Sequence, residues 1–254
     1  MALIDESTQF NADNLDSPVI GIAARVGRHD SGLHQHHKGQ LLYAPQGCMT
    51  ITLAGVQCVL PPTKAAWIPA QTIHCAKMSN VVEYRSLYLS GEYTNIGGSD
   101  VSILEVTPLL RELIERMSFW VWDKPADEMK HTLNLFVEEL QQAKPHTLFL
   151  PLPQDTRLQA WLDSLQTNNA PSLNHLSQQI AASSKTISRI FVRETGMPYQ
   201  AWRQQWRLLK AIEHLSLGLS VADVAHQLEF SSDSAFIAFF KQQTGQTPYQ
   251  YINQ

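Results

Sequence analysis

The chain has 254 residues, 44% of them hydrophobic and 17% charged, which is material for two domains with buried cores. No apolar run approaches the roughly 18 residues of a membrane helix, and the first ten residues show no signal peptide, so we expect a cytoplasmic protein with no membrane partner. Three cysteines, at positions 48, 58 and 75 without a CxxC spacing, argue against a disulfide framework and a zinc ribbon.

The net charge of −4 is unevenly distributed. Residues 1–154 carry 11 Lys and Arg against 16 Asp and Glu, whereas residues 155–254 carry 8 against 7, and from residue 171 onward the balance is 7 against 5. This modest basicity predicts weak non-specific attraction to phosphate. Affinity for a nucleic acid would then depend on geometry and dimerisation.

Residues 1–18 are polar and end in Asp-Ser-Pro, which predicts a flexible amino terminus. From residue 19 to 89, short apolar or alternating runs separated by Pro and Gly turns predict about seven strands. The expected strands are VIGIAARV, QLLYA, CMTITLA, VQCVL, AAWIP, HCAKM and VEYRSLYL. Strands at this spacing favour a small sandwich or jelly-roll barrel.

Histidines are expected at the mouth of this barrel, in HQHHKGQ and after the turn that follows Trp67. Alternation along a strand places His34 and His36 on one face, where His74 from a neighbouring strand can join them. Three imidazoles suit a divalent metal, which makes these three residues a candidate metal site; alternatively, they line a ligand cavity or are simply hydrogen-bonded. The candidate effector-pocket residues are His34, His36, Tyr43, Trp67, His74, Tyr84 and Tyr88.

A helical block follows the strands. Thr107 and Pro108 form a helix start, and a second helix is expected from about Asp127 to Ala143. Both are amphipathic, so they either offer a dimer face or pack back on their own barrel. Residues 144–154 contain three prolines and are the candidate linker; a further helix, capped by Asp155, is expected to end at Asn168-Asn169.

The last third of the chain repeats one pattern. SSKTISRIFVRETGMPYQ at 183–200 and SSDSAFIAFFKQQTGQTPYQ at 231–250 share Ser-Ser, a Phe near the helix end, Thr-Gly and Pro-Tyr-Gln. Each copy follows a short amphipathic segment, LNHLSQQIA or VADVAHQLE. Each unit therefore reads helix, tight turn, helix, and two helix-turn-helix units imply DNA as the partner.

In the first unit we expect Ser184, or else Ser183, to cap a helix over 185–194. Its outer face has donors suited to bases and phosphates, with Arg189 the candidate for a bidentate guanine contact, although such a face can also be merely solvated. In the second unit Ser232 caps the helix, and Asp233 either accepts from cytosine or caps locally. The candidate DNA-binding residues are Ser184, Lys185, Thr186, Ser188, Arg189, Arg193, Ser232, Asp233, Ser234, Ile237 and Lys241.

Residues 199–217 between the units predict one helix of roughly 28 Å, close to the roughly 34 Å between successive major-groove faces. A rigid helix of that length can set the two units in adjacent grooves. Gly218 supplies its carboxyl-terminal cap. Arg203 and Arg207 on the outer side of this helix either touch phosphates or are solvated.

This arrangement resembles the AraC/XylS family of transcription regulators over residues 172–252, and HQHHKGQLLYAPQG with WIPAQTIH resembles a cupin-type effector domain. In metal-binding cupins a Glu follows the His-x-His pair; here Gln40 stands in its place. Members of the regulator family often have Gly and Arg where this chain has Glu229 and Ala238.

The resemblance implies an α+β fold with two domains: a cupin-like β-barrel with dimerisation helices, and an all-α domain of two helix-turn-helix units joined by a long helix. We expect a flexible terminus at 1–18, an effector and dimerisation domain at 19–143, a linker at 144–154 and a DNA-binding domain at 155–254. The implied function is a homodimeric regulator that senses a small molecule and binds promoter DNA, without a cofactor. The alternative is a metal-dependent cupin oxygenase or isomerase that uses His34, His36 and His74.

Overall fold

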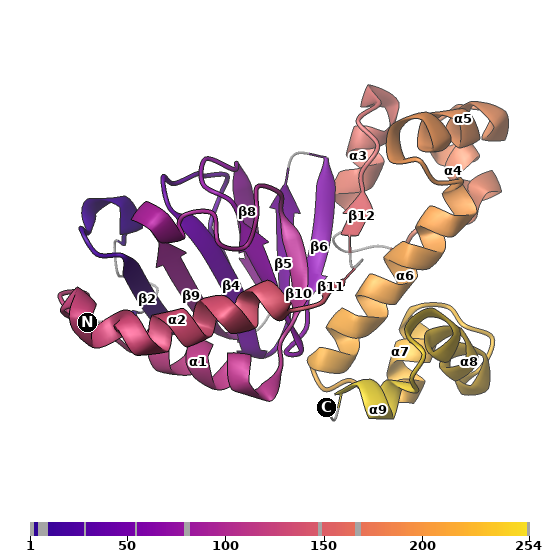
Figure 1. The fold of residues 1–254 in the computed structure, drawn as a ribbon. Helices are drawn as coiled ribbons and strands as arrows, with labels where there is room; N and C mark the ends of the chain where they lie inside the picture. Colours follow the sequence, from indigo (N-terminus) through magenta and orange to yellow (C-terminus); the bar gives the residue numbers. More distant parts are fainter. Residues whose placement is uncertain are drawn as a thin grey trace. The chain divides into compact units, whose positions relative to one another are not determined.

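The computed structural model describes residues 3–4, 10–27, 29–53, 55–78, 82–146, 149–165 and 169–252. They divide into two compact units (Figure 1), one of residues 1–53 and 59–148 and one of residues 54–58 and 149–254. The first unit is rich in strands and the second is almost entirely helical. None of the described helices combines the length and the apolar character that a membrane crossing requires.

The strands form two sheets. Their bounds are β1 Leu3–Ile4, β2 Val19–Val26, β3 His29–Asp30, β4 Gly39–Gln46, β5 Met49–Leu53, β6 Val56–Leu60, β7 Lys64–Ile68, β8 His74–Met78, β9 Val82–Leu89, β10 Ser102–Glu105, β11 Pro145–His146 and β12 Phe149–Pro151. One sheet has the order β1-β2-β9-β4-β7-β10-β11, and the other has the order β12-β6-β5-β8-β3. The β1–β2 pair is parallel, whereas β2, β4 and β9 pair in antiparallel register.

The seven strands expected between residues 19 and 89 are all present, and β2, β6, β8 and β9 have the expected bounds. The predicted linker at 144–154, however, contains two further strands, β11 and β12. Both lie at the edge of their sheets, with Pro145 opposite Leu104 and Pro151 opposite Val56. Proline lacks the N–H that a central strand must donate but is tolerated at an edge, so the prolines that predicted a linker are compatible with these short strands.

Helices α1 (Pro108–Ser118) and α2 (Ala126–Gln142) lie side by side along one face of the larger sheet (Figure 1). The expected cap is present, since the Thr107 hydroxyl accepts from the backbone N–H of Leu110 at 3.1 Å. The inward stripes of both helices join the sheet in one buried cluster. A side chain at Gly21 of β2 would clash with the carbonyl oxygen of Met117, so glycine there allows α1 to approach the sheet closely.

Residues 10–18, part of the predicted flexible terminus, contact the rest of the strand-rich unit. A short 3-10 helix, Ala12–Asn14, is held to the loop before β4 by two contacts. Asp13 accepts hydrogen bonds from the backbone and the ring of His37 at 3.0 Å, and the ammonium group of Lys38 donates to the carbonyl of Leu15 at 2.8 Å. The polar composition that predicted flexibility instead provides these contacts; residues 1–2 and 5–9 lie outside the described residues.

The second unit contains seven helices in its described residues. They are α3 Thr156–Ser164, α4 Leu173–Gln179, α5 Ser184–Thr195, α6 Tyr199–Ser216, α7 Val221–Gln227, α8 Asp233–Thr244 and α9 Pro248–Ile252. The pairs α4–α5 and α7–α8 are the two helix-turn-helix units, and α6 joins them. Asp155 caps α3 as expected, but α3 ends at Ser164, before the predicted Asn168-Asn169.

The repeated Thr-Gly pair ends α5 and α8 in the same way. The hydroxyls of Thr195 and Thr244 donate to the carbonyls of Phe191 and Phe240 at 2.7 and 2.8 Å. The glycine that follows each threonine adopts left-handed φ values, 71° and 79°. Since only glycine takes this conformation without a steric cost, the repeat encodes a matched helix end in the two units.

The turn inside each helix-turn-helix unit places a non-glycine residue in the left-handed region. Ala181 follows α4 with φ 50°, and Glu229 follows α7 with φ 58°. Ser183, rather than the predicted Ser184, then caps α5, because its hydroxyl accepts from the N–H of Thr186 at 3.1 Å. In the second unit Ser232 caps α8 as expected.

We expect Ala181→Gly and Glu229→Gly each to raise the free energy of unfolding of the whole helical unit, which contains both helix-turn-helix units, by about 0.5–1 kcal/mol. Each replacement removes the steric strain of a non-glycine residue with a positive φ. This gain exceeds the stability lost because glycine has the larger entropy in the unfolded chain. Equilibrium urea unfolding followed by circular dichroism measures the change. Ala182→Gly, one residue along and outside the positive-φ region, is the control and should lower stability; equal effects at 181 and 182 would contradict the prediction.

Candidate DNA-binding surface and ligand site

The outer face of α5 presents two unengaged basic side chains. Lys185 and Arg189 are exposed, and no hydrogen bond or ion pair to another residue in the described ranges holds either one. The hydroxyl of Thr186 lies 2.9 Å from that of Ser183, and the hydroxyl of Ser188 donates to the carbonyl of Ser184 at 2.8 Å. Lys185 and Arg189 are therefore the side chains of this face that are available to a ligand.

Arg193 on the same helix is not available in this way. Its guanidinium donates to Glu194 and lies 3.7 Å from the carboxylate of Asp155. The neighbouring arginines lower the pKa of both carboxyl groups, that of Asp155 to about 2. The charge of Arg193 is thus committed to a cluster at the start of α3, which the sequence alone did not indicate because Asp155 is 38 residues away.

The exposed face of α8 is less basic. Asp233, Ser234 and Ile237 are exposed on its first two turns, and Lys241 is exposed one turn later. Phe236 and Phe240 point inward and are fully buried, as the spacing predicted. Asp233 lies in the first turn, where a carboxylate interacts favourably with the amino-terminal end of the helix dipole.

The helix between the units has the expected length. Eighteen residues in α6 span about 27 Å, and Gly218 follows it with φ 84°, its N–H donating to Leu215 at 2.9 Å. Arg203 and Arg207 are half-buried, and carbonyls of other segments bind them. Arg203 donates to the carbonyl of Ala170 at 2.7 Å, and Arg207 donates to the carbonyl of Leu228.

In the strand-rich unit the three predicted histidines come together. Their ring centroids are 4.3 Å apart for His34 and His74, 5.1 Å for His36 and His74, and 6.2 Å for His34 and His36; the ring of Tyr88 lies 5.1 Å from that of His36. Backbone carbonyls of Gly32, Lys38 and Thr72 lie 3.0, 2.6 and 2.8 Å from the Nδ1 atoms of His34, His36 and His74. A carbonyl only accepts, so the Nδ1 of each ring is a donor in these contacts.

The histidines do not fit a metal site. His36 has a second partner, because the side-chain oxygen of Gln40 lies 3.0 Å from its Nε2, and the side-chain nitrogen of Gln40 donates to the hydroxyl of Ser86. Within the described ranges, no three His, Cys, Asp or Glu side chains are placed to hold a metal ion. We therefore assign no chemistry to a metal at His34, His36 and His74.

The remaining nitrogen of His74 is buried without a partner. His74 has no exposed surface, and its Nε2 makes no hydrogen bond to any described residue. Burial, followed by the positive potential of His34 and His36, lowers the pKa of His74 to about 4. At neutral pH this ring is uncharged and presents an acceptor to the interior.

Two of the seven predicted pocket residues lie elsewhere. Tyr43 and Trp67 belong to the buried cluster formed with α1 and α2, on the opposite face of the sheet from Gln40. Tyr84 packs against the cluster that contains Tyr88, on the same face of β9. Side chains alternate along a strand, and residues 40 and 43 are an odd number apart, so the sequence did contain a signal that separates Tyr43 from the histidine side.

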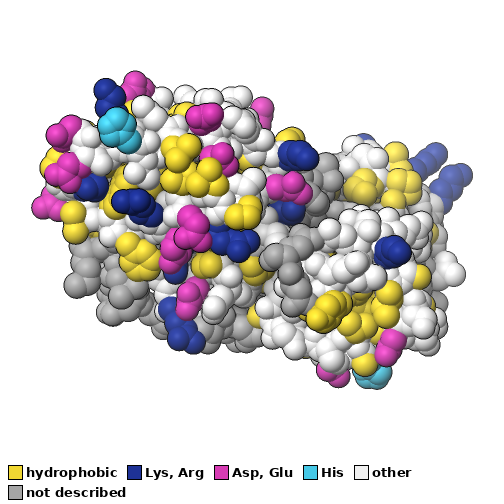
Figure 2. Space-filling view, turned by 60° about the horizontal axis from the view of Figure 1, so that its bottom comes forward, with side chains coloured by type: hydrophobic (Ala, Val, Ile, Leu, Met, Phe, Trp, Pro, Cys, Tyr) yellow, Lys and Arg dark blue, Asp and Glu magenta, His cyan; other side chains and the backbone are white. Residues whose placement is uncertain are grey.

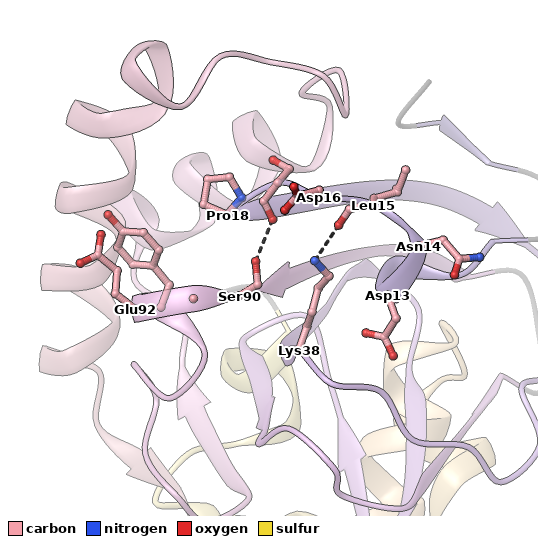
Figure 3. Close-up of a pocket in the computed structure, with 11 residues that line it drawn as sticks. Asp13, Asn14, Leu15, Asp16, Pro18, Lys38, Ser90 and Glu92 are labelled. Atoms are coloured by element: carbon pink, nitrogen blue, oxygen red, sulfur yellow. Dashed lines mark hydrogen bonds between the residues drawn. The ribbon is translucent and has the colours of Figure 1, made fainter.

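The structure also shows a hollow of about 760 Å³ that the sequence did not indicate (Figure 3). Residues 13–18 form one wall, Lys38 another, and residues 90–93 a third. The hydroxyl of Ser90 donates to the carbonyl of Ser17 at 2.8 Å across it. None of the seven predicted pocket residues lines this hollow.

Residues 176–254 match the model of a family described as a helix-turn-helix domain. The HTH-type transcriptional regulator NimR of Escherichia coli is 31% identical over 248 residues, which cover 96% of this chain and 90% of NimR. The HTH-type transcriptional regulator RipA of Corynebacterium glutamicum is 28% identical over 119 residues, which cover 47% of this chain and 36% of RipA.

Among solved structures, the chain is similar to ToxT from Vibrio cholerae, with a TM-score of 0.37 and 12% identity over 93% of this chain and 97% of ToxT. It is also similar to the C-terminal domain of the two-component response regulator yesN from Fusobacterium nucleatum. That match has a TM-score of 0.33 and 31% identity over 37% of this chain and 93% of the domain.

Protonation of His74 should make the strand-rich unit less stable in acid. The folded-state pKa, about 4, lies below the ordinary value of 6.5. Between these pH values the unfolded chain binds a proton that the folded chain does not, so stability is complete above about pH 6.5 and falls toward pH 4, by at most roughly 3 kcal/mol. Unfolding of His74→Gln at pH 7 and pH 4.5 should show a smaller difference than wild type. His131→Gln, an exposed substitution on α2, is the control; identical pH dependence in both variants would refute the assignment.

Proposed function

We infer that this chain, which belongs to the AraC/XylS family of transcription regulators, reads promoter DNA with two helix-turn-helix units in adjacent major grooves and responds to a small molecule in its strand-rich unit. The chain is a DNA-binding transcription regulator and not an enzyme. Because promoter DNA lies in the bacterial cytoplasm, we place the protein there. The observation that carries the proposal is the pair of helix-turn-helix units held on one long helix.

We assign the main reading role to α5. Its two unengaged cations, Lys185 and Arg189, lie on the exposed face of a helix that a helix-turn-helix unit presents to the major groove. The planar guanidinium of Arg189 suits a bidentate contact with guanine, whereas the ammonium of Lys185 suits a phosphate. The hydroxyls of Ser184, Thr186 and Ser188 lie beside them.

We assign a lesser role to α8. Ile237 is exposed in the part of the helix that would face a groove, where an apolar side chain can contact a thymine methyl. Lys241 provides one cation, and the carboxylate of Asp233 repels phosphate unless it accepts from a cytosine amino group. We therefore expect the second unit to discriminate bases less strongly than the first.

We propose that the two sheets form a cupin-like barrel and that a small molecule binds at the cluster of His34, His36, His74 and Tyr88. The support is the unpartnered Nε2 of buried His74, because an unsatisfied polar atom in an interior is costly and a donor group would satisfy it. A ligand that binds better to one arrangement of the chain shifts the population toward that arrangement. No metal is part of this proposal.

We further propose that α1 and α2 form a homodimer contact. Their inner stripes pack on the sheet, but Leu109 and Leu135 remain exposed on the outer side. Figure 2 shows hydrophobic side chains among acidic and basic ones on the face that these helices form. Charged pairs around an apolar centre are usual at dimer interfaces.

Substitution of the two cations of α5 should have different effects on DNA binding. Arg189→Ala should weaken binding to a selected duplex by about 1–3 kcal/mol and relax the preference at one base pair, whereas Lys185→Ala should weaken all duplexes about equally and reduce the salt slope by about 1. Fluorescence anisotropy at two salt concentrations measures both effects.

Arg193→Ala is the matched control, since Arg193 already binds Glu194 and Asp155; it should leave base preference unchanged. A preference that survives in Arg189→Ala and disappears in Arg193→Ala would reverse the assignment.

Leu135→Lys should convert a dimer into a monomer, because it places an additional charge in the apolar centre of the proposed interface. Sedimentation velocity across a range of concentrations measures the association. Val192→Lys, at an exposed apolar residue of α5, is the control and should leave the dimer intact. A dimer of equal strength in both variants would place the interface elsewhere.

A further inference from the structure

Arg207 connects α6 to the second helix-turn-helix unit by two contacts. Its guanidinium donates to the carbonyl of Leu228, the residue that ends α7. The guanidinium carbon also lies 3.7 Å from the centre of the Phe230 ring. That ring is 5.2 Å from Phe236 and 5.1 Å from Phe239 of α8. Arg207 therefore contacts the end of α7 directly and is connected to α8 through the ring of Phe230.

Two more polar side chains connect the units. Arg203, one turn before Arg207, donates to the carbonyl of Ala170, which precedes α4. The side-chain amide of Asn169 donates to the carbonyl of Gln227 in α7 at 2.7 Å, which joins the start of the first unit directly to the second. Arg203 therefore joins α6 to the start of the first unit, and Arg207 joins α6 to the second unit. Asn169 joins the two units to each other.

The two contacts of Arg207 depend on the planar geometry of its guanidinium group. The last carbonyls of a helix have no partner within it and form the negative end of its dipole, so they suit a cationic donor. A guanidinium can donate in its plane while its face lies on an aromatic ring, which an ammonium cannot do in the same way. Burial lowers the pKa of Arg207 to about 10, and the group remains charged at neutral pH.

We propose that Arg207, together with Arg203 and Asn169, is a positioning residue that holds the second helix-turn-helix unit at a fixed place on α6 and so sets the spacing of DNA half-sites that the chain accepts. This inference rests on the proposed binding of DNA by both units. In this proposal Arg207 does not contact DNA. It affects which half-site spacing the chain accepts only by holding α8 in place.

The test measures affinity as a function of half-site spacing. The probe is a duplex that the wild-type chain selects from a randomised pool and that footprinting divides into two half-sites. One derivative has one base pair inserted between the half-sites, which rotates the second by about 34°, and another has the second half-site scrambled. Arg207→Lys keeps the charge but not the stacked, planar contact.

Wild type should lose about tenfold or more in affinity on insertion, because a rigid pair of units cannot follow the rotation. Arg207→Lys should bind the selected duplex about 5- to 20-fold more weakly, since the second contact is no longer held at a high effective concentration. It should bind the scrambled duplex within about twofold of wild type, and should lose little on insertion.

The matched control is Arg157→Lys, an arginine of α3 whose hydrogen bonds go to Asp155, the residue that caps α3. It should keep the wild-type spacing profile. Asn169→Ala removes one connecting hydrogen bond from a half-buried side chain and should broaden the profile in the same direction, which preserves the test if Arg207→Lys fails to fold.

An equal loss on all three duplexes, with the spacing profile unchanged, would show that Arg207 only stabilises the fold and would overturn the inference. A wild-type chain that selects no duplex from the pool would instead overturn the proposed DNA-binding function. A wild-type chain that protects one half-site alone would overturn the two-groove arrangement on which the inference rests.

Discussion

The packing of α6 is the constraint on which the DNA-binding unit depends. Tyr199 and Trp202 at its amino-terminal end are buried against Phe191 of α5, with ring centroids 4.9 and 5.2 Å apart, and the indole of Trp202 donates to the carbonyl of Pro151. A helix rises about 1.5 Å per residue whatever its sequence. The separation of the two units is therefore determined by which residues of α6 each unit contacts, and those contacts differ in kind.

The first unit is attached to α6 through aromatic rings as well as Arg203, whereas the second is attached through Arg207. Apolar burial is not directional and tolerates small rotations, whereas the contacts of Arg207 with Leu228 and Phe230 have a preferred plane and distance. The two repeats are alike in framework and differ in their exposed side chains. The Thr-Gly ends of α5 and α8 are conformationally constrained and recur. The exposed faces, which packing does not constrain, differ: Lys185 and Arg189 of α5 correspond to Ser234 and Ala238 of α8.

Sequence periodicity predicted those parts of the fold whose signals are local. β2, β6, β8 and β9 have the expected bounds because turn residues delimit apolar runs, and the caps at Thr107, Asp155 and Ser232 follow from short side chains before helices. The edge strands β11 and β12 were missed because their pairing depends on partners more than 40 residues away.

The histidine cluster of the candidate site was predicted because its sequence signal is also local, whereas the partners of several arginines were not. His34, His36 and His74 do meet, because strand alternation and the turn before β8 place them together. Arg193, Arg203 and Arg207 could not be assigned from periodicity, which distinguishes the faces of a helix but not whether a carbonyl or carboxylate of a distant segment covers an outer face.

The amino-terminal segment lies beside the histidine cluster. The ring of Phe10 lies 5.6 Å from that of Tyr88, and Tyr88 in turn contacts His36. The same segment is attached to the loop after His36 through Asp13, which accepts from His37. A ligand that donates to the buried Nε2 of His74 must therefore be accommodated next to side chains that also hold this segment. Since a ligand shifts an equilibrium only by its difference in affinity for two arrangements, the contacts of Phe10, Tyr88 and Asp13 are where that difference would arise in this unit.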